Sequence, residues 1–405
     1  MPTFFKHNCM SEILSLQGLI IDKIEKENNF FLIRVHVLRK NIKCPCCNSI
    51  KGITKHDGGK TRKVRHGLSV ENIPMYLEFK SKRYKCKKCN KTFTLSLPES
   101  ILKTRKRFTN LCINQIMKTL KISNFNITKT ETGSSYYLMN KGLDEFYEKN
   151  KIIGLPKHSN LTIGIDGHSR AGHAMATTIT LIRPERKPLG ILPRGSSSEI
   201  VKFFRDNFTE EERLRVDEIS MDMTNDNLGI LKFMLPNAKI VIDKFHVIKH
   251  LNNMLLKEHK FEFNMKNILN HKKIERKGIG TRLPNLIYMH ENEWSCKGRK
   301  KMDEIFLLYP NLKYLYDVKE NIRGIYNKNI SSKEEWMEEL NKLPKEYSKT
   351  LIKRLDEILN YYTNKTTNAY TEGLHTKIKM YKRLSYGIRN PETYVKKMFL
   401  SVIST

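Results

Sequence analysis

The chain has 405 residues, of which 39% are hydrophobic and 9% aromatic, and it carries a formal net charge of +32. A chain of this length exceeds one ordinary core, so we expect two to four domains. The positive charge is spread along the chain, which favours nucleic acid over an anionic membrane as the partner, and the lack of an apolar run of about 18 residues excludes a membrane span.

The N-terminal sequence MPTFFKHNCMSE lacks a charged segment followed by an apolar one, so it does not resemble a signal peptide. We therefore expect a cytoplasmic protein. In that compartment the eight cysteines are thiols or metal ligands rather than disulfide partners.

The first predicted elements are strands. Residues 14–40 alternate apolar and polar side chains in the manner of a hairpin, and they lead directly into a cluster of cysteines. Together they predict a first domain over residues 1–103.

Two Cys-x-x-Cys pairs follow, separated by 38 residues: Cys44 with Cys47, and Cys86 with Cys89. A two-residue spacer lets both thiolates of a pair point at one ion, and the Asn after each second cysteine tolerates the turn that this requires. Four thiolates in a tetrahedral array select zinc, which is structural because the site is closed. Cys46 offers an alternative register, and His56 or His66 an alternative ligand.

Between the two pairs lies a basic segment, KHDGGKTRKVRH, at residues 55–66. We expect it to form a hairpin tip that contacts phosphate. The contacting side chains would be Lys60, Arg62, Lys63 and Arg65. The alternative is a solvated loop.

Residues 104–155 change to a helical period, in which Leu111, Ile116, Leu120 and Ile127 recur at helical intervals. The sequence FNITKTETGSSYYLMNKGLDEF places a short helix before Gly133 and a serine as the N-cap of a second helix. This is the layout of a DNA-binding helix-turn-helix. Its second helix would present four side chains to the major groove: Tyr136, Tyr137, Asn140 and Lys141. An all-α linker without groove contacts is the alternative.

Five short strands rich in β-branched residues are predicted next, at 161–166, 174–182, 189–192, 218–223 and 238–243. Residues 244–365 are polar and helical in pattern, which indicates an all-α insertion. The fold class is thus a multidomain α+β protein. Its α/β part spans 156–243 and resumes at 366–405.

Asp166 and Asp222 close two of these strands. Carboxylates at the carboxyl ends of neighbouring strands converge at one sheet edge, where two like charges repel unless a cation lies between them. A divalent metal ion is therefore expected. The alternative for each aspartate is a turn or helix cap.

Glu372 supplies a third carboxylate. At helical spacing it shares one face with Lys379 and Arg383, while Leu374 and Ile378 lie on the opposite face. We expect Glu372 to bind metal at a scissile phosphate and the two cations to hold the DNA backbone. Two magnesium or manganese ions about 3.5–4 Å apart would then support an in-line phosphoryl displacement.

With these residues the chain resembles the DDE transposases of the ISL-three family of bacterial insertion sequences. The most specific matches are residues 216–252 and 367–390. The resemblance implies a zinc ribbon, a helix-turn-helix, and an RNase H-like catalytic domain interrupted by a helical insertion. It also implies that Asp166, Asp222 and Glu372 are the catalytic triad.

The sequence DKFH matches an Asp/Cys-x-x-His element of such transposases, which implies an auxiliary role for Asp243 and His246 at the edge of the active site. Alternatively, they are a helix cap and a packed histidine. His168 stands where the family often has serine. Trp294 and Trp336 either stack a flipped base or pack in a core.

The sequence thus predicts a DNA transposase that acts on double-stranded DNA as a homo-oligomer, with magnesium or manganese for catalysis and structural zinc. Two alternatives are a metal-dependent nuclease without strand transfer and a zinc-ribbon DNA-binding regulator.

Overall fold

A computed structural model describes residues 11–37, 42–69, 71–95, 97–103, 106–223, 227–269 and 283–403. The chain divides into two compact units. One comprises Met1–Asn150 with Ile378–Thr405, and the other comprises Lys151–Lys377. No helix among the described residues has the length and apolar character needed to cross a membrane.

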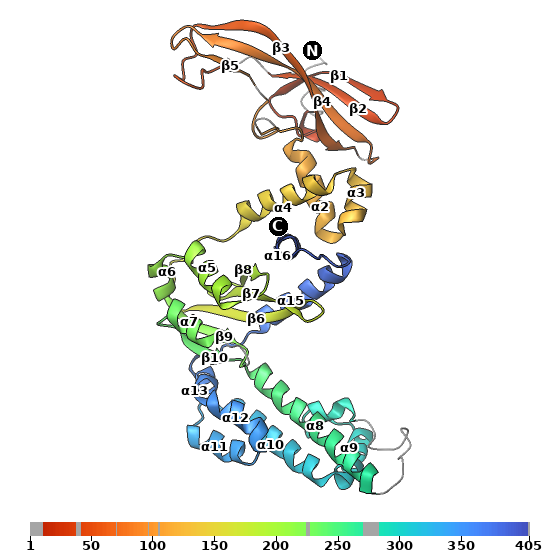
Figure 1. The fold of residues 1–405 in the computed structure, drawn as a ribbon, viewed down its shortest axis with the longest axis vertical. Coiled ribbons are helices and arrows are strands. Elements are labelled where there is room, and N and C mark those ends of the chain that lie inside the picture. The colour runs from red at the N-terminus through yellow and green to blue at the C-terminus, as the bar shows by residue number, and fades with distance from the viewer. Residues whose placement is uncertain are drawn as a thin grey trace. The chain divides into compact units, whose positions relative to one another are not determined.

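The first unit contains an antiparallel hairpin of β1 (Leu19–Glu27) and β2 (Phe30–Val37), which confirms the strand pattern predicted there. The sheet continues with β3 (Ile53–Leu68), β4 (Pro74–Cys86) and the short β5 (Thr92–Thr94). Its order is β1-β2-β4-β3, with β5 paired to β4 (Figure 1). Alternate side chains such as Ile33 and Leu77 point into an apolar core on one face.

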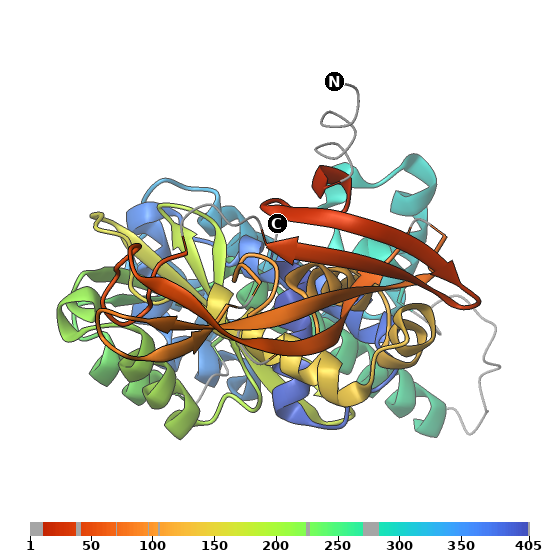
Figure 2. The same ribbon diagram turned by 90° about the horizontal axis from the view of Figure 1, so that it is seen from above.

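The basic segment 55–66 lies within the long strand β3, so the prediction of a hairpin tip there is wrong. The turn between β3 and β4 comes later, where Ser69 N–H donates to the carbonyl of Ile73 and Asn72 adopts φ +59°. The glycines that suggested a turn lie instead at shifts of strand register. Gly59 has φ +66°, and a Cβ there would lie 1.7 Å from the carbonyl oxygen of Ser81. Figure 2 shows β3 and β4 running on as a long twisted ribbon.

Three helices follow in the first unit: α2 (Asn110–Ile122), α3 (Phe125–Thr132) and α4 (Tyr136–Asn150). Gly133 ends α3 in the left-handed conformation, and the hydroxyl of Ser135 accepts a hydrogen bond from Leu138 N–H at the start of α4. These helices and their breaks are as the sequence predicts. The C-terminal helix α16 (Pro391–Val402) packs on them through Leu400.

The second unit is built on a mixed five-stranded sheet. The strands are β6 (Leu161–Ala171), β7 (Ala174–Arg183), β8 (Lys187–Leu192), β9 (Val216–Met221) and β10 (Lys239–Ile242), in the order β10-β9-β6-β7-β8. They confirm the five predicted strands. β6, β9 and β10 run parallel, and β7 and β8 are antiparallel to their neighbours. Helices α5 (Ser197–Asn207), α6 (Glu210–Leu214) and α7 (Leu228–Met234) connect them.

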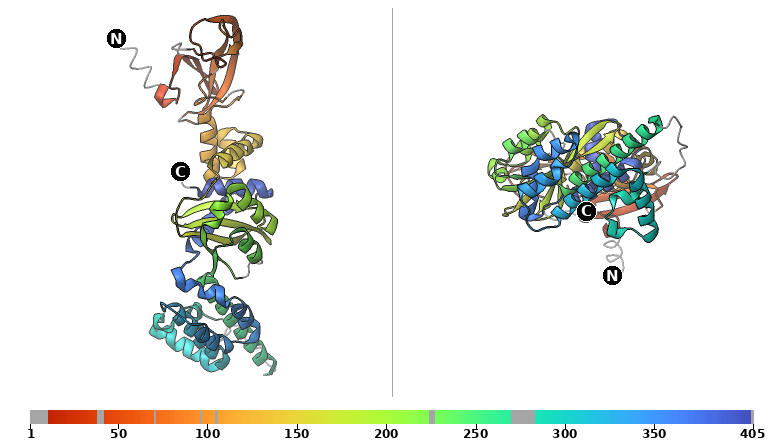
Figure 3. Two further views of the ribbon diagram at one scale, coloured as in Figure 1. Left: turned by 90° about the vertical axis from the view of Figure 1, so that its left-hand side faces the viewer. Right: turned by 90° about the horizontal axis from the view of Figure 1, so that it is seen from below.

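From residue 244 to 364 the regular elements of the described residues are helices and short 3-10 turns, joined by loops. The helices are α8 (Lys244–Leu269), α9 (Cys296–Leu308), α10 (Pro310–Tyr326), α11 (Lys333–Asn341), α12 (Lys345–Lys353), α13 (Leu355–Leu359) and α14 (Tyr361–Asn364), with turns η1 (Asn285–Tyr288) and η2 (Glu291–Glu293) (Figure 3). Trp294 and Trp336 are both buried, Trp294 against Phe306 and Trp336 against Tyr326. The structure therefore favours core packing for both tryptophans.

Candidate active site

Two of the three carboxylates stand at one edge of the second sheet. Asp166 and Asp222 each follow a residue of the paired, parallel strands β6 and β9, because Ile165 lies opposite Met221. Neighbouring strands lie about 4.8 Å apart, so the two carboxylates start from adjacent positions. Asp166 does not end its strand as expected. β6 continues to Ala171 beside β7, so Asp166 marks only the end of the parallel pairing.

Helix α15 (Ala369–Leu384) carries Glu372 in its first turn. The Thr371 hydroxyl lies 2.7 Å from that of Thr180 on β7. Gly164 on β6 lets the helix come this close, because a Cβ there would lie 2.5 Å from the Asn368 side chain and 2.6 Å from those of Thr371 and Thr180. Glu372 is thereby held over the edge that carries the two aspartates. Leu374 and Ile378 are buried and Lys379 and Arg383 exposed, as predicted for this helix.

His246 lies between two of the carboxylates. Its Nδ1 is 3.4 Å from Oδ1 of Asp222, and its Nε2 is 3.7 Å from Oε1 of Glu372. Asp243 is buried directly before α8, where Oδ1 accepts from Phe245 N–H and Oδ2 accepts from Asn368 N–H. Asp243 is thus a helix cap that also ties the start of α8 to the residue before α15. Ligand atoms of Asp243, His246 and Glu372 all lie within 4.8 Å of one another.

A second histidine was missed by sequence reasoning. His375 is buried one helical turn after Glu372, with Nδ1 3.3 Å from Oδ2 of Asp166. Its ring lies 4.8 Å from that of buried His168, whose Nδ1 is 3.2 Å from the Thr178 hydroxyl. The spacing Glu372-x-x-His375 was the available signal, because residues three apart share a helix face.

The carboxylates differ in their protonation equilibria. Burial raises the pKa of Glu372, and the nearby charges of Asp243 and Asp166 raise it further. Burial also raises the pKa of Asp243. Burial opposes ionisation of Asp166 as well, but His375 and His246 outweigh it and hold the pKa of Asp166 below its usual value. The buried Oε1 of Glu372 accepts no hydrogen bond from the described residues, since Nε2 of His246 lies 3.7 Å away, beyond hydrogen-bond distance. A divalent cation bound here would offset the repulsion between these crowded carboxylates and would coordinate the oxygen that has no hydrogen bond.

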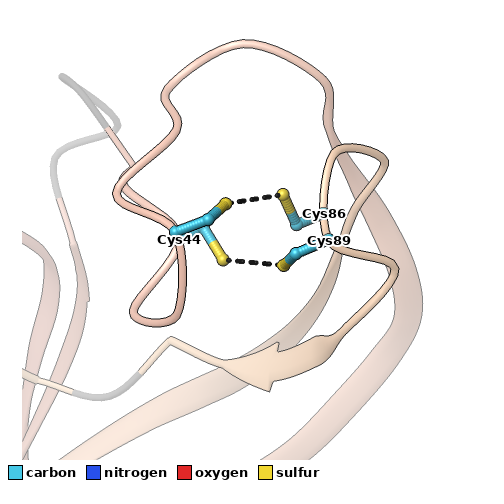
Figure 4. A group of neighbouring side chains, drawn as sticks. Cys44, Cys86 and Cys89 are labelled. Carbon is cyan, nitrogen blue, oxygen red and sulfur yellow. Dashed lines mark hydrogen bonds between the residues drawn. The ribbon is translucent and has the colours of Figure 1, made fainter.

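The first unit holds a separate sulfur cluster. Sγ of Cys44 lies 3.5 Å from Sγ of Cys89, and Sγ of Cys47 lies 3.6 Å from Sγ of Cys86 (Figure 4). All four sulfurs fall within 4.8 Å of one another, as four thiolates on one zinc ion require. Cys46 is exposed and outside the cluster.

The turns of the sulfur cluster form as predicted, since Asn48 and Asn90 have φ of +53° and +58°. Of the alternative ligands, His66 instead contacts the Leu14 carbonyl and the Thr109 hydroxyl. The backbone N–H of Cys47 lowers the pKa of Cys44, which favours the thiolate that binds metal.

Comparison with known proteins assigns the chain to a family. Residues 163–398, more than half of the chain, match the family model for the transposases of the DDE class and ISL3 type. The chain belongs to the ISL3 family of DDE transposases. Residues 40–89 of the transposase also match the zinc finger of the transposases of IS204, IS1001, IS1096 and IS1165. No curated protein matches it. All three predicted triad residues fall within the first match and all four cysteines within the second.

The basic side chains of β3 in this transposase divide into two kinds. Lys60 and Lys63 are exposed, and Nζ of Lys63 lies 3.8 Å from the Phe30 ring. Arg62 donates to the carbonyl of Lys106, and Arg65 donates to the carbonyls of Thr132 and Gly133 at the end of α3. The two lysines are therefore available to phosphate, whereas the two arginines bind the transposase's own backbone.

The predicted contacts on α4 and α15 are mostly exposed in the transposase. Tyr136 and Tyr137 retain 44% and 73% of their accessible surface, so both rings face solvent. Asn140 and Lys141 are half-buried. Nζ of Lys141 lies 5.6 Å from the ring of Tyr137.

Gly164→Ala is expected to lower both the stability and the DNA cleavage activity of the transposase. The added methyl would force α15 away from β6, and overpacking of this kind costs about 1–3 kcal/mol. Thermal denaturation and a cleavage assay measure the two effects. Gly229→Ala on α7 is the matched control, because Gly229 is exposed and a Cβ there meets nothing within 4 Å. If the two variants had equal melting temperatures and equal cleavage rates, the position of α15 would not depend on its close approach to Gly164.

Proposed function

We propose that this transposase binds the terminal inverted repeats of its element, cleaves DNA at the ends and joins the freed 3′ hydroxyl to target DNA. The observation that supports this most strongly is the approach of Asp222 and Glu372 to one histidine, His246, although 150 positions separate the two carboxylates in the chain. A buried histidine between residues so far apart in the chain supports a single site at the sheet edge.

The proposed domains follow the predicted boundaries. Residues 156–243 and 366–405 form an RNase H-like catalytic domain, and residues 244–365 are a helical insertion within it. The last part of the catalytic range, residues 378–405, belongs to the first compact unit. Support comes from the mixed sheet β10-β9-β6-β7-β8 and from the helices and 3-10 turns that are the regular elements in the described part of 244–364. Residues 1–103 form the hairpin and zinc ribbon, and 104–155 a helix-turn-helix.

In this proposal Asp166, Asp222 and Glu372 hold two magnesium or manganese ions. Such ions, when bound, activate the attacking oxygen and stabilise the leaving oxygen of an in-line displacement. Gly167 N–H donates to Oδ1 of Asp166 at 2.8 Å, while His375 lies against Oδ2, so the carboxylate is fixed before substrate arrives. No covalent enzyme intermediate is required, because water and then the 3′ hydroxyl are the nucleophiles.

Asp243 and His246 act as auxiliary residues. Asp243 joins the N-termini of α8 and α15 through two backbone N–H groups. These hydrogen bonds fix the start of α15, and with it the position of Glu372 relative to the sheet. His246 lies between Asp222 and Glu372, 3.4 Å from the first carboxylate and 3.7 Å from the second. Both residues therefore position the triad rather than react with DNA.

DNA binding is assigned to exposed basic and aromatic groups. Lys379 and Arg383 lie on the same helix face as Glu372 and would bind the phosphates that lead away from the cleavage point. Tyr136 and Tyr137 at the start of α4 would meet the double-stranded end. Synapsis of two ends requires more than one active site, so we propose a homo-oligomer on DNA.

A strand-transfer assay tests the function. The transposase is incubated with labelled end duplex, supercoiled plasmid and Mg²⁺, and labelled end joined to plasmid is the expected product. Cleaved ends without joined product would indicate a nuclease. Binding without cleavage would indicate a DNA-binding regulator.

His375→Ala is expected to destabilise the transposase by about 1–3 kcal/mol at neutral pH, because buried Asp166 loses a charge-assisted partner. A carboxyl whose pKa is lowered by folding stabilises the fold above its unfolded pKa, and this stabilisation is lost as pH falls through the folded pKa. The difference in melting temperature between wild type and variant should therefore narrow as the pH falls through the folded pKa of Asp166. A difference that stayed constant with pH would contradict a role through Asp166.

A further inference from the structure

The first unit has a cavity of about 450 Å³ apart from the sulfur cluster. It lies between the first turn of α3, the side of α4 and the segment 385–390 that joins α15 to α16. Its lining has four asparagines, an arginine and three aromatic rings, and no carboxylate. A cavity without acidic groups on a chain of net charge +32 is suited to an anionic ligand.

Tyr386 is the most unusual part of this lining. The residue keeps 79% of its accessible surface, and its backbone is left-handed with φ +46°, followed by Gly387 at φ +72°. Bulky residues rarely adopt this conformation, and such outliers gather at ligand contacts. Tyr386 is the second residue after the end of α15, a position where a left-handed residue, usually glycine, often closes a helix. Here a tyrosine occupies it, and its exposed ring lines the cavity.

A second ring and a set of amides complete the lining. Tyr136 is 44% exposed, and Phe125 supports its ring at a centroid distance of 6.0 Å. The Tyr136 hydroxyl donates to Oδ1 of Asn126, which fixes that carboxamide at the cavity wall. Asn140 reaches the same cavity from α4. Aromatic faces beside amide groups are the combination that recognises a nucleobase by stacking and hydrogen bonding.

The shape of the cavity limits which form of DNA fits. Duplex DNA is read by a convex element inserted into its groove, and a hollow of this volume does not admit a duplex. A single nucleotide does fit. We propose that the cavity binds one unpaired nucleotide of the end DNA, with its base stacked on Tyr386 and its phosphate near Arg389. This proposal rests on DNA as the substrate, as in the proposed function.

Fluorescence anisotropy without added divalent metal tests the proposal. The probes are a labelled blunt end duplex and the same duplex with a short single-stranded extension. Tyr386→Ala is expected to weaken binding of the extended duplex about fivefold or more and to leave binding of the blunt duplex unchanged, because one base–aromatic stack is lost. Tyr386→Phe should bind both probes as wild type does.

Tyr314→Ala is the matched control, because this tyrosine on α10 is 51% exposed and lies in the other unit. A 2-aminopurine base in the extension should be quenched by wild type and not by Tyr386→Ala. The proposal would be overturned if wild type and Tyr386→Ala bound the extended duplex with equal affinity. It would also be overturned if Tyr386→Ala lost affinity equally for the extended and the blunt duplex. Cleavage is not measured in this assay, so its failure is distinct from a failure of the transposition chemistry.

Discussion

Asp222→Asn is expected to lower cleavage of the transposon end by about a hundredfold or more while leaving binding of end DNA unchanged. The amide keeps the shape of the side chain but removes the charge that a divalent cation requires, and the loss of one such electrostatic contact at a reacting centre costs about 10²–10³ in rate. The side chain of Asp222 is 28% exposed, and the oxygen of an asparagine can still face Nδ1 of buried His246, so we expect the variant to fold.

Asp206→Asn is the control for the change in charge. Asp206 is exposed on α5 in the same unit as Asp222, and removal of its charge should change neither cleavage nor binding. Cleavage is measured on labelled end duplex with saturating Mg²⁺, and binding by gel shift without it. Retained cleavage in Asp222→Asn would remove Asp222 from the catalytic set, and a parallel loss of binding would show a defect in folding instead.

Cys86→Ser is expected to abolish zinc binding and the binding of end DNA by the first unit. Cys86 is fully buried at the end of β4, and its sulfur lies 3.6 Å from that of Cys47. The free energy of zinc binding in small zinc-binding peptides is about 10–16 kcal/mol, and it contributes to folding. This equals or exceeds the free energy of unfolding of a typical domain. Loss of one thiolate therefore releases both turns of the cluster.

Cys46→Ser is the matched control, because Cys46 lies in the same turn as Cys44 and Cys47 but is exposed and outside the cluster. Zinc content is measured by elemental analysis of the purified chain, and DNA binding by gel shift. We expect one zinc per chain in wild type and Cys46→Ser, and none in Cys86→Ser. Zinc retained by Cys86→Ser, or lost from Cys46→Ser, would contradict the assignment of the four ligands.

The features that the sequence predicted correctly have local causes. Asn48 and Asn90 take the left-handed turn because each follows a Cys-x-x-Cys pair, and α15 buries Leu374 and Ile378 because their spacing is helical. The strands β6 and β7 contain runs rich in β-branched residues. In each case the residues that determine the structure are neighbours in the chain.

The features that it did not predict depend on contacts between distant segments. Gly58 and Gly59 resemble a turn, but pairing with β4 keeps them inside β3, where they allow a shift of register. Arg65 resembles a phosphate contact until α3 is packed beside it. His375 has no recognisable role until β6 places Asp166 3.3 Å away.

Anomalous scattering from a crystal soaked in Mn²⁺ tests the central claim, shared metal ions at Asp166, Asp222 and Glu372, most directly. We expect two manganese peaks about 3.5–4 Å apart, with Asp166, Asp222 and Glu372 as their protein ligands. A single peak bound by Asp243, His246 and Glu372, with both of the other aspartates unligated, would contradict it.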